Sequence, residues 1–148
     1  MPRSRRSSHP APHSEPGSDR TRYASGTPWE PKVGYSRAVR VGPRIYVSGT
    51  TATAPDGSLV GRGDAYAQTV QALDNIELAL AALGSERADI VRLRVYVTDI
   101  GDFEAIARAL GERFREVRPA NTLVQVAALI DPAMKVEIDA DAEVPPNR

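Results

Sequence analysis

The sequence contains no cysteine, so the chain has no disulfide framework, no thiol nucleophile and no cysteine-based zinc or iron-sulfur site. Its two histidines, His9 and His13, both stand near the amino terminus. The rest of the chain therefore excludes a Ser-His-Asp triad and a two-histidine metal site, unless this terminus folds back into a cleft. Catalysis would have to use carboxylates, Tyr or Ser hydroxyls, Arg, backbone N-H groups or bound water. We expect no metal and no cofactor.

Long apolar runs and a net charge are missing too. No apolar run approaches the ~20 residues that cross a bilayer, and the first residues, MPRSRRSSHP, lack the apolar middle region of a secretion signal. The 19 basic and 19 acidic residues give a formal net charge of +0, so no overall field attracts nucleic acid or an anionic membrane. We expect a cytoplasmic protein with neither of these as a partner.

The amino-terminal segment has the composition of a disordered tail. Residues 1–22 are rich in Ser, Pro and Arg and have almost no large apolar residue, so they bury too little to offset the entropy lost on folding. We predict a disordered basic tail over residues 1–26 and a single domain over residues 27–148. The tail is either a solvated extension, which the composition favours, or a polybasic binding arm.

The apolar periodicity of the domain predicts the element order β-β-α-β-α-β-β. Asp64 is suited to cap the first helix, which ends near Gly84. Two helices can cover only one face of a sheet of this size, so the other face stays open. The predicted strands are 35–41, 44–49, 90–98, 121–126 and 134–143, and the predicted helices are 65–83 and 103–114.

The last predicted strand has one apolar and one ionised face. Side chains alternate between the two sides of a strand, and residues 134–143 alternate apolar with charged types. The charged side shares the open face of the sheet with Arg92, Arg94 and Tyr96, which suits either solvent or a wet subunit interface. The charged residues of this strand that are predicted to point to the open face are Lys135, Glu137, Asp139 and Asp141.

Four motifs, spread over nearly every predicted element, resemble the Rid family (reactive intermediate deaminase, also called YjgF). They are VGPRIYVSGTTA, DAYAQTVQALDNI, VRLRVYVTDI followed by DF, and RPANTLVQVAALIDPAMKVEIDADA. The resemblance extends from about Thr27 to the end of the domain. It implies a chorismate-mutase-like α+β fold with a mainly antiparallel sheet and two helices on one face. It also implies a homotrimer with small-molecule clefts between neighbouring subunits.

The resemblance further implies hydrolysis of reactive enamines and imines to a carbonyl compound and ammonia. In the best-known branch of the family, an arginine directly after Pro-Ala grips the substrate carboxylate. This chain has Asn121 there, and an amide offers neutral hydrogen bonds but no charge and no bidentate fork. We therefore expect a divergent branch that is not an efficient 2-iminopropanoate deaminase.

Other family positions are partly retained. Glu137 matches a glutamate thought to position or activate water, which makes it the predicted catalytic residue. Burial and the neighbouring Asp139 are expected to raise the pKa of Glu137; the alternative is an ion pair with Arg92 or Arg94. The predicted substrate-binding residues are Tyr35, Ser48, Gly49, Ala107, Asn121 and Leu123, of which Ala107 and Leu123 replace an asparagine and a thiol residue of the family.

Three functions remain open at this point. The first is an enzyme that acts on a reactive imine, enamine or activated carbonyl compound through Glu137. The second is a ligand-binding or scaffold trimer without catalysis. The third is a conventional 2-imino acid deaminase despite Asn121.

Overall fold

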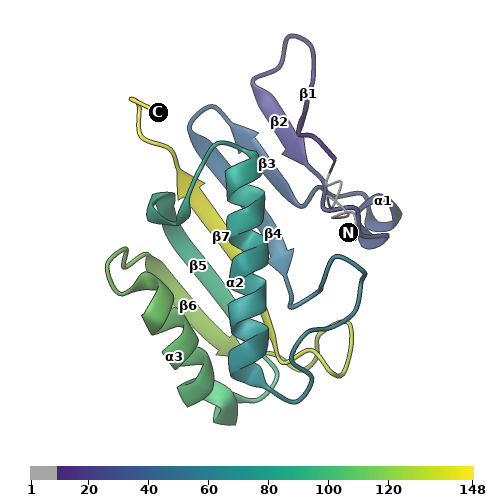
Figure 1. Cartoon of the computed structure of the whole chain (residues 1–148), viewed down its shortest axis with the longest axis vertical. Helices are drawn as coiled ribbons and strands as arrows, with labels where there is room; N and C mark the ends of the chain where they lie inside the picture. Colours follow the sequence, from purple (N-terminus) through teal and green to yellow (C-terminus); the bar gives the residue numbers. More distant parts are fainter. Residues whose placement is uncertain (1–9) are drawn as a thin grey trace, which may run out of the picture.

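The computed structural model describes residues 10–148, which form one seven-stranded sheet in the order β1-β2-β3-β4-β7-β5-β6. The two long helices, α2 and α3, lie together on one face of this sheet (Figure 1). The β5–β6 pair is parallel and every other pair is antiparallel. The predicted α+β fold is confirmed, and so is the predicted element order from β3 to β7. The elements of the predicted domain are β3 (Ala38–Val41), β4 (Arg44–Thr50), α2 (Ala65–Ala82), β5 (Ile90–Val97), α3 (Phe103–Phe114), β6 (Ala120–Gln125) and β7 (Val136–Glu143).

The amino-terminal segment differs from the disordered tail that the sequence predicts. Two strands, β1 (His13–Ser14) and β2 (Arg20–Tyr23), extend the sheet beyond β3, with Tyr23 opposite Ala38. Tyr23 is buried in the core. Composition does not reveal this arrangement, because pairing with the edge of β3 satisfies the backbone while a single aromatic side chain supplies the burial. Residues 1–9, including His9, lie outside the described part of the chain.

A short helix, α1 (Trp29–Val33), precedes β3 and is also absent from the predicted elements. It ends at Gly34, whose φ of 84° is left-handed and therefore suits glycine. The chain turns sharply there, so Tyr35 lies in the connection to β3 rather than in the strand itself.

The core lies between the sheet and the two long helices. The predicted alternation of β7 is confirmed, because Val136, Ile138 and Ala140 are fully buried while the charged residues between them are only partly covered. The predicted cap is confirmed as well, since the Asp64 carboxylate accepts a hydrogen bond of 3.0 Å from the Ala67 N-H. The largest fully buried side chains on α2 are Leu73, Ile76 and Leu80.

The open face of the sheet carries a network of paired charges. The Arg94 guanidinium lies 3.0 Å from the Asp139 carboxylate and 3.6 Å from that of Asp141. The Tyr96 hydroxyl donates a 3.2 Å hydrogen bond to Asp139. This network joins β5 to β7 and pairs Arg94, one of the two arginines predicted as possible partners of Glu137, with other carboxylates. Within residues 10–148, none of the helices has both the length and the apolar character needed to cross a membrane.

Candidate active site

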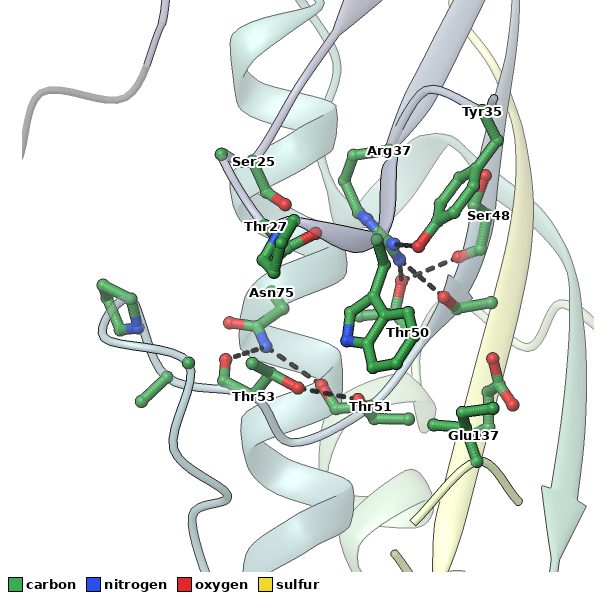
Figure 2. A pocket seen from close by; sticks show the side chains of 18 of the residues that line it. Ser25, Thr27, Tyr35, Arg37, Ser48, Thr50, Thr51, Thr53, Asn75 and Glu137 are labelled. Atoms are coloured by element: carbon green, nitrogen blue, oxygen red, sulfur yellow. Dashed lines mark hydrogen bonds between the residues drawn. The ribbon is translucent and has the colours of Figure 1, made fainter. Parts of the chain in front are cut away.

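A pocket of about 750 Å³ opens beside β4, between α1 and the loop that follows β4. Its wall is formed by three further parts of the chain: the segment before β3, one side of α2, and the start of β7 with the loop before it. These parts are far apart in the sequence, so the pocket exists only in the folded chain. Figure 2 shows its polar side chains, with Arg37 and Tyr35 near one end and Glu137 on the neighbouring strand.

The Glu137 carboxylate lies against the backbone of Gly49. The register between β4 and β7 shifts between Val47 and Thr50, so the β4 backbone is irregular at Gly49. A Cβ atom built on Gly49 would stand 3.0 Å from Glu137 Cδ and closer still to Oε1. Only glycine leaves room for the carboxylate in this position.

The environment of Glu137 raises the pKa of its carboxyl group. Burial raises its pKa, the positive charge of Arg37 opposes this shift, and the neighbouring Asp139 adds to it, so that the pKa stands above its ordinary value. This is the direction predicted from the sequence. Among the described residues, Glu137 makes no ion pair, and Arg37 rather than Arg92 or Arg94 supplies the positive charge that acts on it.

Arg37 is a functional-site candidate that the sequence analysis missed. The residue is 9% exposed, and its guanidinium donates hydrogen bonds to the Gly49 carbonyl at 2.5 Å, to Thr50 Oγ1 at 3.1 Å and to the Tyr35 hydroxyl at 3.0 Å (Figure 2). A signal was available: Arg37 is two residues after Tyr35, and such a spacing places side chains on the same side of an extended chain.

The charge of Arg37 is balanced by a buried carboxylate behind it. Glu30 is 4% exposed, and its Oε2 lies 3.9 Å from Arg37 Nε. Burial alone would raise the pKa of Glu30, but hydrogen bonds from Ser25 and Thr27 and the charge of Arg37 together hold it below its ordinary value. Glu30 is therefore ionised and pairs with Arg37 at neutral pH.

The rest of the pocket wall consists of the loop after β4, which is hydrogen-bonded to α2, and of exposed apolar side chains. Asn75 on α2 donates hydrogen bonds to the carbonyls of Thr51 and Thr53, at 3.0 and 2.8 Å, and so ties the loop after β4 to the helix. Trp29, at the start of α1, lines the pocket and is 44% exposed. The other exposed apolar side chains that line the pocket are Val33, Leu78 and Ile130.

The family model described as Endoribonuclease L-PSP matches residues 26–144. The chain belongs to this family, which is also the YjgF, RutC or Rid family. The resemblance found in the sequence motifs is thus confirmed.

Solved and curated members of the family agree with this assignment. The crystal structure of Rv2704 from Mycobacterium tuberculosis, a member of the YjgF/YER057c/UK114 family, is 46% identical and superposes with a TM-score of 0.77 over 84% of this chain and 99% of that one. The 3-aminoacrylate deaminase RutC of Acinetobacter baylyi is 34% identical over 80% of this chain and 93% of its own length. A 2-iminobutanoate/2-iminopropanoate deaminase of Capra hircus is 36% identical over 73% and 78%, respectively.

The structure brings four of the predicted family residues together in the pocket, namely Tyr35, Ser48, Gly49 and Glu137. The Ser48 hydroxyl donates a 2.7 Å hydrogen bond to the Ser36 carbonyl, so it links β4 to the segment before β3 and donates to a carbonyl rather than to a base that could activate it. His13 lies exposed in β1 and does not line the pocket. Within residues 10–148, no group of three His, Cys, Asp or Glu side chains is arranged to hold a metal ion.

The other three predicted residues lie elsewhere in the same chain. Asn121 and Leu123 are on the edge strand β6, where they pair with Leu93 and Val95 of β5. The side chains of those two β5 residues are buried under the helices, so Asn121 and Leu123 point to the helix-covered side of the sheet. Ala107 is on α3, which covers the same side of the sheet. Asn121 is exposed. The residues predicted from the family motifs therefore form two separate groups in this chain.

Proposed function

We propose that this chain hydrolyses a small reactive imine or enamine, with Glu137 as its catalytic residue. The observation that carries the proposal is a half-buried carboxylate with a raised pKa, lying against the Gly49 backbone in a large pocket. A carboxylate whose pKa moves toward neutrality can both accept and return a proton at working pH. Two relatives named as deaminases of 3-aminoacrylate and of 2-imino acids support the same reaction class.

The proposed reaction adds one water molecule across a C=N bond. Glu137 accepts a proton from the water molecule while the water oxygen attacks the imine carbon. Glu137 then returns the proton to the imine nitrogen. In the resulting carbinolamine the hydroxyl proton passes, through Glu137, to the nitrogen as the C-N bond breaks, which releases ammonia and leaves the carbonyl compound. An enamine first takes a proton on carbon to become the imine. The Tyr35 hydroxyl is placed to donate a hydrogen bond to the substrate.

The charges of the pocket do not favour an acidic substrate. The lining contains one guanidinium, that of Arg37, and two carboxylates, those of Asp56 and Glu137. Arg37 is already paired with Glu30, and Asn121 has no charge. We propose that the substrate is an imine, enamine or activated carbonyl compound that binds without a carboxylate anchor, so 2-iminopropanoate is a poor substrate.

The two separate groups of family residues support a site shared between subunits. We propose a homotrimer in which the exposed edge near Asn121, Leu123 and Ala107 of one subunit faces the Glu137 pocket of its neighbour. Sedimentation analysis tests this arrangement: a trimer is expected, and a monomer at micromolar concentration contradicts it. A trimer that binds a small molecule without transforming it is the second candidate function, favoured by Ala107 and Asn121, which stand where the family has an asparagine and an arginine.

One assay tests the proposed function. Ammonia release is measured from enzymatically generated 2-iminopropanoate and from an imine without a carboxylate, for the native chain, Asn121→Arg and Glu137→Ala. We expect the native chain to prefer the carboxylate-free imine, Glu137→Ala to lose that activity, and Asn121→Arg to gain activity on 2-iminopropanoate. Glu143→Ala is the matched control, because Glu143 is on the same strand but outside the pocket.

Two results would contradict the proposal. Rapid hydrolysis of 2-iminopropanoate by the native chain, abolished in Glu137→Ala, would mean that the arginine is not needed and that the chain is a conventional deaminase. No ammonia release from either substrate by any variant would favour the ligand-binding trimer.

A further inference from the structure

We propose that Arg37 is the positioning residue of this site: its guanidinium holds Tyr35 and the Gly49 backbone in the arrangement that faces the substrate. This inference rests on the proposed function and deepens it. The sequence motifs assign roles to Tyr35, Gly49 and Glu137 but none to Arg37, which touches the first two and acts on the third.

The hydrogen bonds of Arg37 join two parts of the pocket that are not neighbours in the sequence. One terminal nitrogen donates to the Gly49 carbonyl and to Thr50 Oγ1, and the other donates to the Tyr35 hydroxyl. A planar guanidinium presents these donors in a rigid fork and stays charged at every relevant pH. The distance between the Tyr35 oxygen and the Gly49 backbone is therefore set by one rigid group.

The hydrogen bond from Arg37 to Tyr35 also determines which further hydrogen bond the Tyr35 hydroxyl can make. Because the hydroxyl oxygen accepts a hydrogen bond from Arg37, its own proton remains available for a different acceptor. Tyr35 lines the pocket, so a bound substrate is the acceptor that the geometry supplies. Arg37 thus makes Tyr35 a donor toward the ligand.

The positive charge of Arg37 also acts electrostatically on Glu137. The charged and titratable groups that act on or face Glu137 are Arg37, from the segment before β3, Asp139 on the same strand, and Tyr96, which is paired with Glu137 on β5. Of these, Arg37 favours the ionised carboxylate, while Asp139 opposes it. Three hydrogen bonds to protein atoms hold the guanidinium in place, and its charge is paired with Glu30. Arg37 therefore acts on the reaction through Glu137 and Tyr35 rather than by binding the substrate itself.

The test compares Arg37→Gln, which removes the charge, with Arg37→Lys, which keeps the charge but loses the fork. The titration of the Glu137 carboxyl carbon is followed by NMR and requires no substrate. We expect Arg37→Gln to raise the pKa of Glu137 and Arg37→Lys to leave it near the native value. Both variants are expected to lose about tenfold or more in kcat on the carboxylate-free imine, because misplaced groups cost rate rather than affinity.

Arg40→Gln is the matched control. Arg40 lies on β3, three residues after Arg37, and its guanidinium donates to two backbone carbonyls, those of Gly42 and Leu83, at 2.9 and 2.7 Å. It makes comparable bonds but lies outside the pocket, so its loss should leave the Glu137 titration unchanged. Equal titration curves for Arg37→Gln and Arg40→Gln would overturn the inference, whether or not the chain hydrolyses imines.

A milder variant keeps the inference testable if Arg37→Gln does not fold. Tyr35→Phe removes only the oxygen that accepts from Arg37. The side-chain nitrogen signals of Arg37 in the native protein should be resolved by NMR, because its rotation is restrained, and they should broaden in Tyr35→Phe. Identical signals in the two proteins would show that Arg37 does not hold Tyr35.

Discussion

Replacing Gly49 by Ala tests the closest contact of the site. The new methyl group would stand 3.0 Å from Glu137 Cδ and 3.4 Å from Cγ, with Oε1 nearer than either. Carbon atoms normally approach to about 3.5–4.0 Å. The carboxylate must therefore move away from the backbone by about 0.5–1 Å.

The shift should reduce activity far more than stability. The atoms that must move are the end of a flexible side chain, so the free energy of unfolding should fall by only about 1 kcal/mol, at the low end of the usual cost of overpacking. A misplacement of about 1 Å at a catalytic group, by contrast, can cost about a hundredfold in rate. We expect Gly49→Ala to fold, to melt a few degrees lower and to lose most of the imine hydrolysis proposed for the native chain.

A double-mutant cycle checks this reasoning. Urea denaturation is measured for Gly49→Ala, Glu137→Ala and the double variant. In the Glu137→Ala background the new methyl group no longer meets a carboxylate, so the destabilisation by Gly49→Ala should disappear. This corresponds to a coupling energy of about 1 kcal/mol. An equal loss in both backgrounds would refute the contact. Gly111→Ala is the control, because Gly111 lies in α3 with no atom within 4 Å of a new Cβ, and it should stabilise by about 0.4–1 kcal/mol.

Two further predictions concern the carboxylates of the pocket. Because the pKa of Glu137 is raised above 4.5, the folded chain binds a proton more tightly than the unfolded chain, and stability falls as the pH rises through the interval above 4.5. Glu137→Gln should therefore gain stability over the native chain as the pH increases in urea titrations; a difference independent of pH contradicts this. Glu30→Gln should lower the free energy of unfolding by about 1–3 kcal/mol at neutral pH. Since the pKa of Glu30 is held below 4.5, that loss should shrink as the pH falls through and below 4.5, and an undiminished loss in acid would contradict it.

The sequence by itself determined most of the fold. Val136, Ile138 and Ala140 alternate with charged residues, and the side chains of a strand alternate between its two faces, so the buried side of β7 follows from local order alone. The Asp64 cap is equally local, because the carboxylate and the N-H that it accepts from are three residues apart. Glu137 and Tyr35 were predicted as site residues through motifs that surround them in the sequence, and both line the pocket.

Only the tertiary structure decided how the site is assembled. Arg37 follows Tyr35 by two residues, but its partners Gly49 and Thr50 lie 12 and 13 residues further on, and no local pattern specifies such a pairing. The same holds for β2, which is ordered by pairing with the edge of β3 rather than by its own composition. It also holds for Gly49, where a side chain is excluded because the Glu137 carboxylate, on the neighbouring strand β7, occupies the space of a Cβ atom. Periodicity along the chain reports which way a side chain points, while contacts between distant segments depend on register and on the folded core.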